Sequence, residues 1–416
     1  MRHHPLDGIA REKLRITRID VLPLSYVDPA GDLWRTGSYQ VWKTDGAITR
    51  IFTDEGLVGI GEGSPYEGPA YIKEYTEQVI QPVLIGRNPF DVELLTNRGG
   101  GSRRARAPWA GVDNACWDLI GKAKGLPVYR LLATDHEPCP RVRVYASGGV
   151  EHAWYEHGER QLIEEALRYQ AQGFGAFKFR CGTDWRAAGM DFARYVPILR
   201  RLRAAVGPHF RLMHEAVGTS GGVLERIITD FAPALQELGF YWFEEPFGDT
   251  RPEFLPLHLR LRAAMPGVII AGGERFCQRF DAQEWLDCRA LDIVQSDCNV
   301  AGITENWCIA RMAWLRGCRS IPHNWHGGGT LIANAHFAAG IPNGEYCELN
   351  MTRNPLRDAL FAEPLVVRDG YLELPDKPGF GVELSEDVER RFPYVSGSYS
   401  RPNPRLAAGR LPQVPG

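Results

Sequence analysis

The sequence predicts an α/β fold: a (β/α)7β-type TIM barrel with an α+β capping domain formed by the N-terminal region and a C-terminal segment. The first observation behind this prediction is that eight short apolar segments alternate with amphipathic segments between residues 141 and 350. The second is that three of these segments end close to Glu215, Glu244 and Glu274, at intervals of 29 and 30 residues. One strand, one helix and two loops fill such an interval, so a repeating β/α unit would gather the three side chains at the carboxyl ends of neighbouring parallel strands.

Length and composition limit the class of protein. A chain of 416 residues with 44% hydrophobic residues is long enough for a large barrel and an accessory domain. The net charge of −3 favours neither nucleic acid nor an anionic membrane as a partner, and no stretch approaches the roughly 20 apolar residues of a membrane span. Nine cysteines without regular spacing are typical of reduced thiols, so we expect a cytoplasmic protein that acts on a small molecule.

Residues 1–135 are predicted to form the capping domain. Alternating strand patterns cover residues 16–27 and 39–65, and an Asp-Glu-Gly sequence at residues 54–56 supplies a hairpin turn inside the second region. Helical patterns follow at residues 71–82 and 108–132. This mixture of strands and helices is typical of an α+β domain.

Residues 136–354 are predicted to form the barrel, with helices such as 164–172 and 303–317 between its strands. Residues 355–398 return to a strand-and-turn pattern and are expected to rejoin the cap, so the last barrel helix would be altered or lost. The proline-containing residues 399–416 are predicted to be an extended tail, or an arm against a neighbouring subunit of a homo-oligomer. The eight barrel strands are predicted at residues 141–147, 175–180, 210–215, 241–245, 268–274, 291–297, 318–323 and 345–350.

Three carboxylates that converge at one barrel mouth would repel one another. A hard divalent cation such as Mg²⁺ neutralises them, so Glu215, Glu244 and Glu274 are predicted to bind a magnesium ion. The alternative is that these glutamates lie in unrelated surface loops, in which case their regular spacing is accidental.

Lys178 and Arg180 end the second predicted barrel strand. Strand alternation turns both side chains toward the barrel interior and Phe179 toward the helices. There the two cations could meet an anionic substrate, and Lys178 could act on a proton if neighbouring positive charge lowers its pKa. Arginine stays protonated, so Arg180 can orient or stabilise a substrate but is a poor base. The competing interpretation is a pair of solvated cations.

Candidate proton-transfer groups lie on the last three strands. Asp297 ends the sixth predicted strand, and His323 and His326 follow the seventh. An aspartate bonded to one imidazole nitrogen leaves the other nitrogen to exchange a proton. Glu348 on the eighth strand could donate a hydrogen bond to a developing oxyanion if burial keeps it protonated. Structural histidines and an ordinary rim carboxylate are the alternatives.

Two further segments are candidates for binding. The loop at residues 26–39 is predicted to close over the barrel mouth, with Trp34 and Arg35 as substrate contacts, although its composition also suits an ordinary surface loop. The glycines at residues 327–329 precede a predicted helix. The backbone N–H groups at that helix start could bind a phosphate or a carboxylate, or the glycines could form a tightly packed turn.

Together these residues resemble the enolase superfamily, and within it the mandelate-racemase-like acid-sugar dehydratases. The resemblance covers nearly the whole chain. Its most specific pieces are WFEEP with AGGE, the lysine–arginine pair at 178 and 180, DIVQSD followed by AGITE, and the cap segment 109–132. The resemblance implies that Glu215, Glu244 and Glu274 bind Mg²⁺, that Asp297 is the partner of a histidine, and that Glu348 is the electrophilic acid.

The chain departs from the family pattern at several positions. Glu215 stands where the family more often has aspartate, and Val217 replaces a frequent asparagine. Arg180 replaces the second lysine of a K-x-K pattern, which weakens the case for a racemase with two bases. Related sequences place the seventh-strand histidine either directly after the proline or three residues later, and we prefer His323 to His326 as the base.

The resemblance thus implies a Mg²⁺-dependent lyase that removes the proton α to a carboxylate and eliminates water from a sugar acid, giving a 2-keto-3-deoxy acid. Racemisation or epimerisation of a 2-hydroxy acid through the same enediolate is the alternative. A protein that binds an acid without catalysis is a third interpretation.

Overall fold

The computed structural model of the protein describes residues 3–35, 39–96, 101–150, 159–180, 191–215 and 223–403. Val217 lies outside these residues, as does the end of the chain from residue 404. No helix in the described part of the chain is long and apolar enough to cross a membrane.

The cap is built on a three-stranded antiparallel sheet in the order β1-β4-β5. Its strands are β1 (Ile16–Val27), β4 (Lys43–Thr53) and β5 (Val58–Glu62). Gly56, with φ +79°, lies in the predicted turn between β4 and β5. The other cap elements before the long helix are η1 (Pro65–Glu67), α1 (Pro69–Tyr75), η2 (Thr76–Ile80), α2 (Gln81–Leu84) and α3 (Glu93–Thr96).

The long cap helix α4 (Arg103–Lys124) starts five residues before the predicted position at residue 108. It starts earlier because Ser102 caps it: the Ser102 hydroxyl accepts a hydrogen bond from the Ala105 N–H at 3.2 Å. Gly125 ends it in the left-handed conformation, and a separate helix α5 (Val128–Leu132) follows. The helix packs closely on β5, since a Cβ added at Gly61 would lie 2.3 Å from the Gly111 carbonyl oxygen.

The barrel contains a strand in each of the eight predicted segments. Neighbouring strands from β6 to β12 pair in parallel, and β13 pairs in parallel with β6. These strands are β6 (Arg141–Gly148), β7 (Ala176–Phe179), β8 (Arg211–Glu215), β9 (Trp242–Glu244), β10 (Ile269–Gly272), β11 (Ile293–Val294), β12 (Arg319–Ser320) and β13 (Cys347–Asn350). One buried cluster takes a side chain from nearly every strand, including Tyr145, Met213, Trp242 and Ile293, so the barrel interior is filled.

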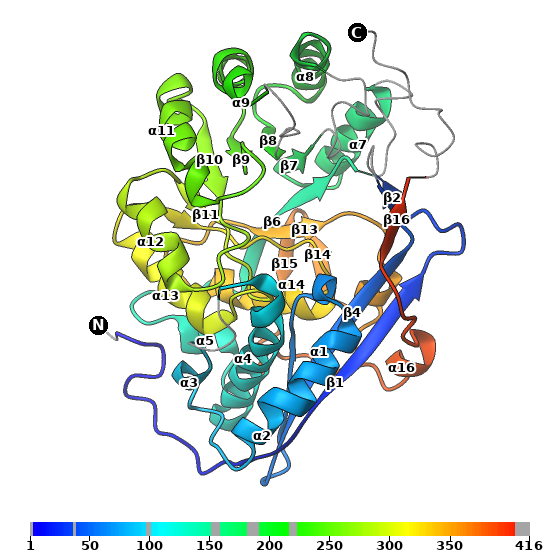
Figure 1. The fold of residues 1–416 in the computed structure, drawn as a ribbon, viewed down its shortest axis with the longest axis vertical. Coiled ribbons are helices and arrows are strands. Elements are labelled where there is room, and N and C mark those ends of the chain that lie inside the picture. Colours follow the sequence, from blue (N-terminus) through cyan, green and yellow to red (C-terminus); the bar gives the residue numbers. More distant parts are fainter. Residues whose placement is uncertain are drawn as a thin grey trace.

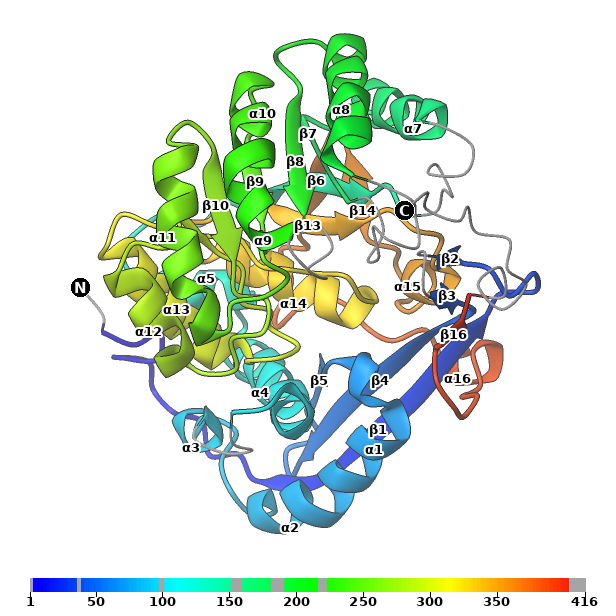
Figure 2. The ribbon, with the colours of Figure 1, turned by 45° about the horizontal axis from the view of Figure 1, so that its top comes forward.

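Helices surround the barrel strands on the outside. In Figure 1 the cap sheet with α1, α2 and α4 lies below the barrel, and in Figure 2 outer helices lie alongside β8, β9 and β10. The outer elements are α7 (Arg160–Ala171), α8 (Phe192–Val206), α9 (Val223–Arg226), η3 (Ile227–Phe231), α10 (Ala232–Glu237), η4 (Pro252–Phe254), α11 (Leu255–Ala264), α12 (Arg279–Asp287), α13 (Ile303–Trp314) and α14 (Gly328–Ala339).

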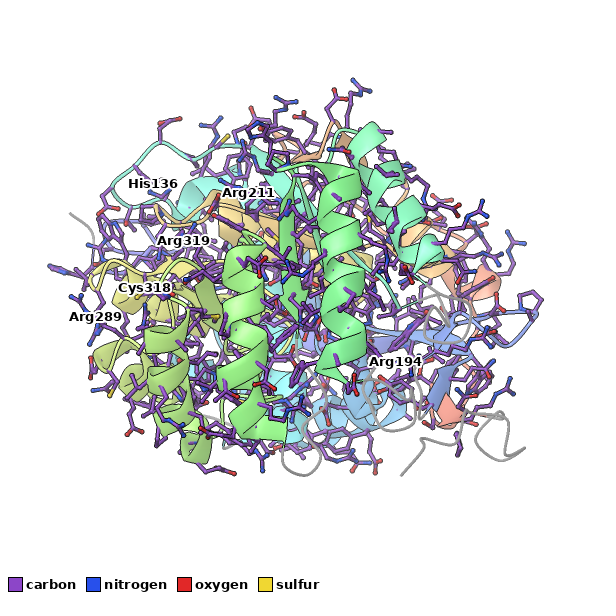
Figure 3. All side chains as sticks on the ribbon, turned by 90° about the horizontal axis from the view of Figure 1, so that it is seen from above. His136, Arg194, Arg211, Arg289, Cys318 and Arg319 are labelled. Carbon is purple, nitrogen blue, oxygen red and sulfur yellow. The ribbon has the colours of Figure 1, made fainter. Side chains whose placement is uncertain are left out.

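The amino-terminal end of the barrel is joined by a polar cluster. Arg211 at the start of β8 and Arg319 at the start of β12, both labelled in Figure 3, form ion pairs with Glu345. Tyr241 adds a hydrogen bond of 2.6 Å from its hydroxyl to Glu345. These contacts hold strands together at the barrel end opposite to the predicted site, where a stabilising role is expected.

The segment after the barrel differs in part from the prediction that it returns to the cap. A single helical turn, α15 (Pro355–Asp358), follows β13. The hairpin of β14 (Val366–Arg368) and β15 (Tyr371–Glu373) then pairs antiparallel with barrel strand β6. The open edge of β6 near Arg141 provides unpaired backbone groups, so the hairpin extends the barrel sheet there.

Later parts of this segment do return to the cap. Gly379 forms a bridge to Pro127, and the Phe380 N–H donates a hydrogen bond of 2.7 Å to Asp118 Oδ1. Pro393 forms a bridge to Leu24 of β1, after the short helix α16 (Val388–Arg391). The strand β16 (Ser400–Pro402) then pairs antiparallel with β3 (Tyr39–Val41), which also pairs with β2 (Trp34–Arg35). Part of the predicted tail is therefore an ordered strand of the cap.

Candidate active site

Three glutamates lie at the carboxyl ends of neighbouring barrel strands. Glu215 ends β8 and Glu244 ends β9, and the two residues are paired in the register of these strands. Glu274 follows the end of β10 by two residues. Glu244 is buried, with 1% of its surface exposed, whereas Glu215 and Glu274 keep 15% and 21% of their side-chain surface accessible. Glu215 and Glu244 are therefore neighbours at the strand ends, and Glu274 follows the next strand.

Lys178 lies among three carboxylates. Its Nζ is 2.5 Å from Glu244 Oε1, 2.8 Å from Glu348 Oε1 and 3.3 Å from Glu215 Oε2. Burial lowers the pKa of Lys178, but the three negative charges outweigh burial and raise that pKa well above its usual value. These carboxylates favour the ammonium form of Lys178, so the protein groups alone do not lower its pKa as a role as a base would require.

Arg180 forms an ion pair with Glu215, with 2.7 Å between NH1 and Oε1. Burial raises the pKa of Glu215, but Arg180 and Lys178 outweigh it and lower the pKa to about 2. The Tyr39 hydroxyl of the cap also interacts with Arg180. Glu215 is therefore ionised, and Arg180 joins a barrel carboxylate to the cap loop.

The pKa of Glu244 is shifted in the opposite direction from that of Glu215. Burial, together with Glu215 and Glu348, raises its pKa to about 7 in spite of the attraction of Lys178. Gln295 donates a hydrogen bond of 2.6 Å from Nε2 to Glu244 Oε2. The sequence reasoning did not single out Gln295, although it precedes Asp297 by two residues and alternation would have placed both on one face.

His323 and Asp297 form a hydrogen-bonded dyad. His323 Nδ1 lies 2.8 Å from Asp297 Oδ2, and His323 Nε2 lies 3.4 Å from Glu274 Oε2. Asp297 Oδ1 also accepts hydrogen bonds of 3.0 Å from Asn334 Nδ2 and from the Asn299 N–H. Burial lowers the pKa of His323, but Glu274, Glu348 and Asp297 outweigh it and raise the pKa to about 10.

His326 does not share this arrangement. Its Nε2 is 4.0 Å from Asp297 Oδ2, beyond hydrogen-bond distance, and its ring lies 4.4 Å from the ring of Tyr66. Burial lowers the pKa of His326 to about 3, so its imidazole is neutral. Of the two histidines proposed from the sequence, His323 is the one that the aspartate orients.

Glu348 is fully buried at the end of β13. Its Oε2 accepts a hydrogen bond of 2.7 Å from the Asn324 N–H. Burial raises its pKa, but Lys178 and His323 outweigh burial, so the pKa lies below its usual value. In this arrangement burial alone does not keep Glu348 protonated, because Lys178 supplies a compensating charge, and the role of Glu348 as an acid stays a prediction.

Comparison with known proteins is decisive for the family. Residues 36–133 match the mandelate racemase / muconate lactonizing enzyme N-terminal domain, and residues 161–388 match the enolase C-terminal domain-like family. The chain belongs to the enolase superfamily. The two matches fall on the cap and on the barrel with its following segment.

This enolase superfamily chain is similar to several characterised relatives. It is 32% identical over 354 residues to an arabinonate dehydratase of Saccharolobus solfataricus, covering 83% of this chain and 89% of the relative. It is also 32% identical over 361 residues to a D-galactarolactone cycloisomerase of Agrobacterium fabrum, covering 83% and 90%. The crystal structure of an enolase superfamily member from Polaromonas sp. JS666 superimposes with a TM-score of 0.79 at 28% identity, covering 92% and 99%.

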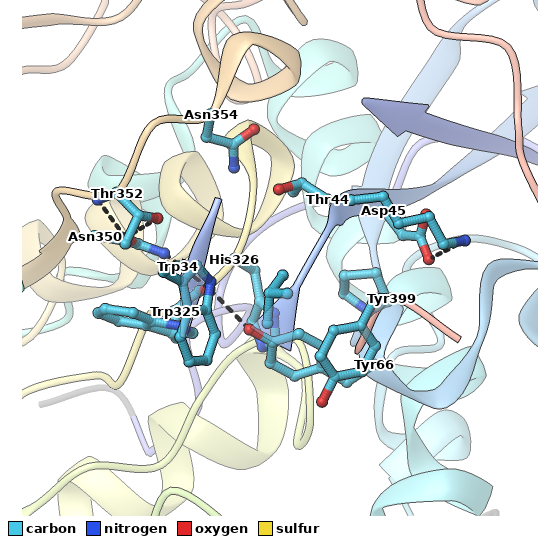
Figure 4. Close-up of a pocket in the computed structure, with 13 residues that line it drawn as sticks. Trp34, Thr44, Asp45, Tyr66, Trp325, His326, Asn350, Thr352, Asn354 and Tyr399 are labelled. Atoms are coloured by element: carbon cyan, nitrogen blue, oxygen red, sulfur yellow. Dashed lines mark hydrogen bonds and ion pairs between the residues drawn. The ribbon is translucent and has the colours of Figure 1, made fainter. Parts of the chain in front are cut away.

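The two cap residues predicted to contact a substrate have different surroundings in this superfamily member. Trp34 on β2 lines a pocket that also includes Tyr66, Trp325 and His326, and its ring meets the Trp325 ring edge-on at 5.9 Å (Figure 4). Arg35 does not line this pocket. Arg35 NH1 lies 3.5 Å from Asp32 Oδ2. The guanidinium group of Arg35 therefore pairs with a carboxylate of the cap loop.

The glycine run before α14 receives a carboxylate from the protein itself. Glu62 at the end of β5 accepts a hydrogen bond of 3.0 Å from the Thr330 N–H at the helix start. A Cβ added at Gly329 would lie 2.8 Å from Glu62 Oε2, so close packing also requires glycine there. The glycine run is therefore a closely packed turn, and the carboxyl group that meets the helix start is that of Glu62.

Two groups of side chains are candidates for a metal ion in this superfamily member. Potential ligand atoms of Asp297, His323 and His326 lie within 4.8 Å of one another, but Asp297 and His323 are already bonded to each other. The three glutamates supply only carboxylate oxygens, the donors that suit a hard cation such as Mg²⁺. Glu215 and Glu244 are paired at neighbouring strand ends and Glu274 follows the next strand, so this second set fits magnesium.

Proposed function

We propose that this chain is a Mg²⁺-dependent lyase that dehydrates a sugar acid to a 2-keto-3-deoxy acid. The observation that carries the proposal is the His323–Asp297 dyad, which lies beside three strand-end glutamates. The similarity to an arabinonate dehydratase supports both the substrate class and the elimination of water.

Glu215, Glu244 and Glu274 are the residues that would hold magnesium. When bound there, the ion supplies Lewis-acid stabilisation of a substrate carboxylate and of the charge that develops on it, an effect worth several kcal/mol. Arg180 supplies a fixed positive charge beside Glu215 and orients the same carboxylate. Lys178, held by Glu244 and Glu348, adds a second cation near the developing enediolate.

His323 moves the protons in this proposal and takes the first one in its neutral form. Magnesium bound at Glu274 would favour that form, because it would offset the carboxylate that most raises the pKa of His323. Because Asp297 holds Nδ1, the α-proton of the substrate passes to Nε2 as the enediolate forms. The bond from the β-carbon to its hydroxyl then breaks, and Nε2 returns the proton to the leaving oxygen, which departs as water. The resulting enol tautomerises to the 2-keto-3-deoxy acid. A positioned base of this kind contributes about 10²- to 10⁴-fold to the rate.

Lys178 and Arg180 favour elimination over racemisation. A racemase needs a base on each face of the α-carbon, but Arg180 does not lose its proton and Lys178 is held as an ammonium group by three carboxylates. The similarity to a cycloisomerase nevertheless supports a second candidate, isomerisation through the same enediolate.

A substrate panel separates these candidates. The purified protein is incubated with Mg²⁺ and pentonic, hexonic and aldaric acids, and 2-keto acid is measured alongside exchange of the α-hydrogen in D₂O. Keto acid is the expected product. Exchange without keto acid would favour a racemase or epimerase, and binding without exchange would favour a protein that binds an acid without catalysis.

A pair of variants tests the choice of base. His323→Asn is expected to lower the rate by about 10²-fold or more, because it removes the oriented imidazole. His326→Asn keeps the dyad and is the matched control. Loss of turnover only in His326→Asn would overturn the assignment of His323.

We also propose that the enzyme works in the cytoplasm as a homo-oligomer. All eight cysteines in the described part of the chain are unpaired, which suits a reducing compartment. Light scattering coupled to size-exclusion chromatography tests the oligomeric state, and a monomer at working concentration would refute it.

A further inference from the structure

A pocket lies between the cap and the barrel beside the catalytic dyad, and we name it the cap pocket. Its wall includes Trp34, Asp45 and Tyr66 from the cap and His326 and Asn350 from the barrel (Figure 4). His326 connects the pocket to the dyad, because its Nε2 lies 4.0 Å from Asp297 Oδ2. A substrate held at the dyad would therefore extend its far end into the cap pocket.

The walls of the cap pocket combine aromatic rings with neutral polar groups. Figure 4 shows the indoles of Trp34 and Trp325 on one side and the rings of Tyr66 and Tyr399 on the other. The two tyrosine rings lie 4.7 Å apart. Asn350, Thr352 and Asn354 supply amide and hydroxyl groups. Aromatic faces pack against the C–H groups of a polyol, and neutral polar groups bond its hydroxyls.

The charge of the cap pocket is balanced by one buried ion pair. Lys43 and Asp45 on β4 both line the pocket, and Lys43 Nζ lies 2.9 Å from Asp45 Oδ2. Lys43 also donates to the Val395 carbonyl oxygen, and Asp45 Oδ1 accepts a hydrogen bond of 2.7 Å from the Ser25 hydroxyl. Lys43 is 0% exposed beneath these two acceptors, whereas Asp45 keeps 8% of its surface exposed, so the carboxylate is the member of the pair that faces the pocket. The neutral His326 adds no charge.

Cations next to the pocket wall are also paired. Arg357, which donates to the Asn350 carbonyl oxygen, lies 2.8 Å from Asp358 Oδ1. Arg103, whose charge acts on Tyr66 and Tyr399, lies 3.8 Å from Glu67 and does not line the pocket. Among the described residues of the pocket wall, no cation is left without a carboxylate partner. A second carboxylate on a substrate would therefore meet Asp45 without a cation to receive it.

We propose that the cap pocket binds the uncharged polyhydroxyl end of an aldonic acid, which has one carboxylate, and that Asp45 excludes aldaric acids, which have two. The discrimination comes from repulsion of the second carboxylate rather than from extra contacts to the favoured substrate. This inference rests on the proposed function, because it takes the first carboxylate to bind beside Arg180 and the glutamates.

Matched acids test the proposal directly. D-Galactonate is compared with galactarate, and D-gluconate with D-glucarate, by calorimetric Kd and by kcat/KM in the presence of Mg²⁺. The wild-type protein is expected to favour the aldonic acid of each pair by about tenfold or more in both measurements. Equal or better binding and turnover of the aldaric acids would overturn the inference while leaving the dehydratase proposal intact.

Asp45→Asn is the deciding variant. It removes the repelling charge and leaves Lys43 as an unpaired cation, so the preference for the aldonic acid is expected to fall by about tenfold or more. Ser25→Ala is the control, since it removes a hydrogen bond to Asp45 without changing charge and should leave the preference unchanged. A preference that stays the same in Asp45→Asn would refute the role of Asp45.

A second variant guards against misfolding. If circular dichroism shows that Asp45→Asn does not fold, Tyr399→Arg places a cation on the pocket wall at a partly exposed position and should shift the preference the same way. An unchanged preference there would also count against the proposal. Selective binding of aldonic acids without turnover of any acid would instead refute the dehydratase proposal and support the inference about the pocket.

Discussion

Glu62 offers a sharp test of the electrostatics between the cap and the barrel. Its carboxyl group is 1% exposed and accepts hydrogen bonds from the Thr330 N–H at 3.0 Å and the Ala47 N–H at 3.3 Å. Burial is the largest influence on this group and outweighs the hydrogen bonds, so its pKa rises from 4.5 to about 7. The variant Glu62→Gln keeps the shape of the side chain but cannot titrate.

The sign and size of the effect follow from these two pKa values. The folded protein holds the proton of Glu62 more tightly than the unfolded chain, so its contribution to stability is complete below pH 4.5 and is lost as the pH rises through about 7. The difference corresponds to about 3 kcal/mol in the free energy of unfolding. Glu62→Gln should lack this loss, so wild type should lose about 3 kcal/mol relative to the variant across that range.

Urea unfolding followed by circular dichroism measures this difference. Both proteins are compared from about pH 4.5 to pH 8 in EDTA, because bound magnesium would add its own pH dependence. Glu55→Gln in the exposed turn between β4 and β5 is the matched control and should follow wild type. Parallel curves for wild type and Glu62→Gln would refute the assignment of a raised pKa to Glu62.

Three further predictions concern packing, the dyad and the metal. Gly329→Ala places a Cβ 2.8 Å from Glu62 Oε2, so thermal unfolding should show a loss of about 1–3 kcal/mol, and an unchanged Tm would contradict the close packing. Asp297→Asn leaves His323 Nδ1 without its carboxylate and should lower kcat/KM by about 10²- to 10⁴-fold, whereas full activity would argue against the dyad. Dialysis against EDTA should abolish keto acid formation and added Mg²⁺ should restore it; turnover that survives chelation would exclude a metal role.

Local sequence patterns predicted the barrel strands and the meeting of the glutamates. Each predicted strand is a short run of apolar or aromatic residues that is followed by turn residues. In a parallel sheet the carboxyl ends of neighbouring strands lie at the same edge. Glu215 and Glu244 therefore became neighbours without any knowledge of their contacts. The same rule of alternation places Lys178 inside the barrel and would have found Gln295.

Partners that are distant in the chain could not be predicted in this way. Tyr371 pairs with Arg143 because the closed fold leaves one edge of β6 free for another segment. Glu62 accepts a hydrogen bond from the Thr330 N–H because the fold brings the start of α14 to the end of β5. The charge of Lys178 could not be predicted for a related reason. The pKa of Lys178 depends on the sum of three carboxylates from other strands, and the local lysine–arginine pair alone suggested the opposite sign.

The strand β16 has a consequence for the biosynthesis of the protein. The carbonyl oxygen of Ser398 accepts a hydrogen bond from Trp42 Nε1, and these residues are 356 positions apart. Tyr399, next in the chain, belongs to the wall of the cap pocket. A nascent polypeptide can therefore complete its barrel before this wall exists, and the cap pocket is finished only once Ser398 and Tyr399 have been translated.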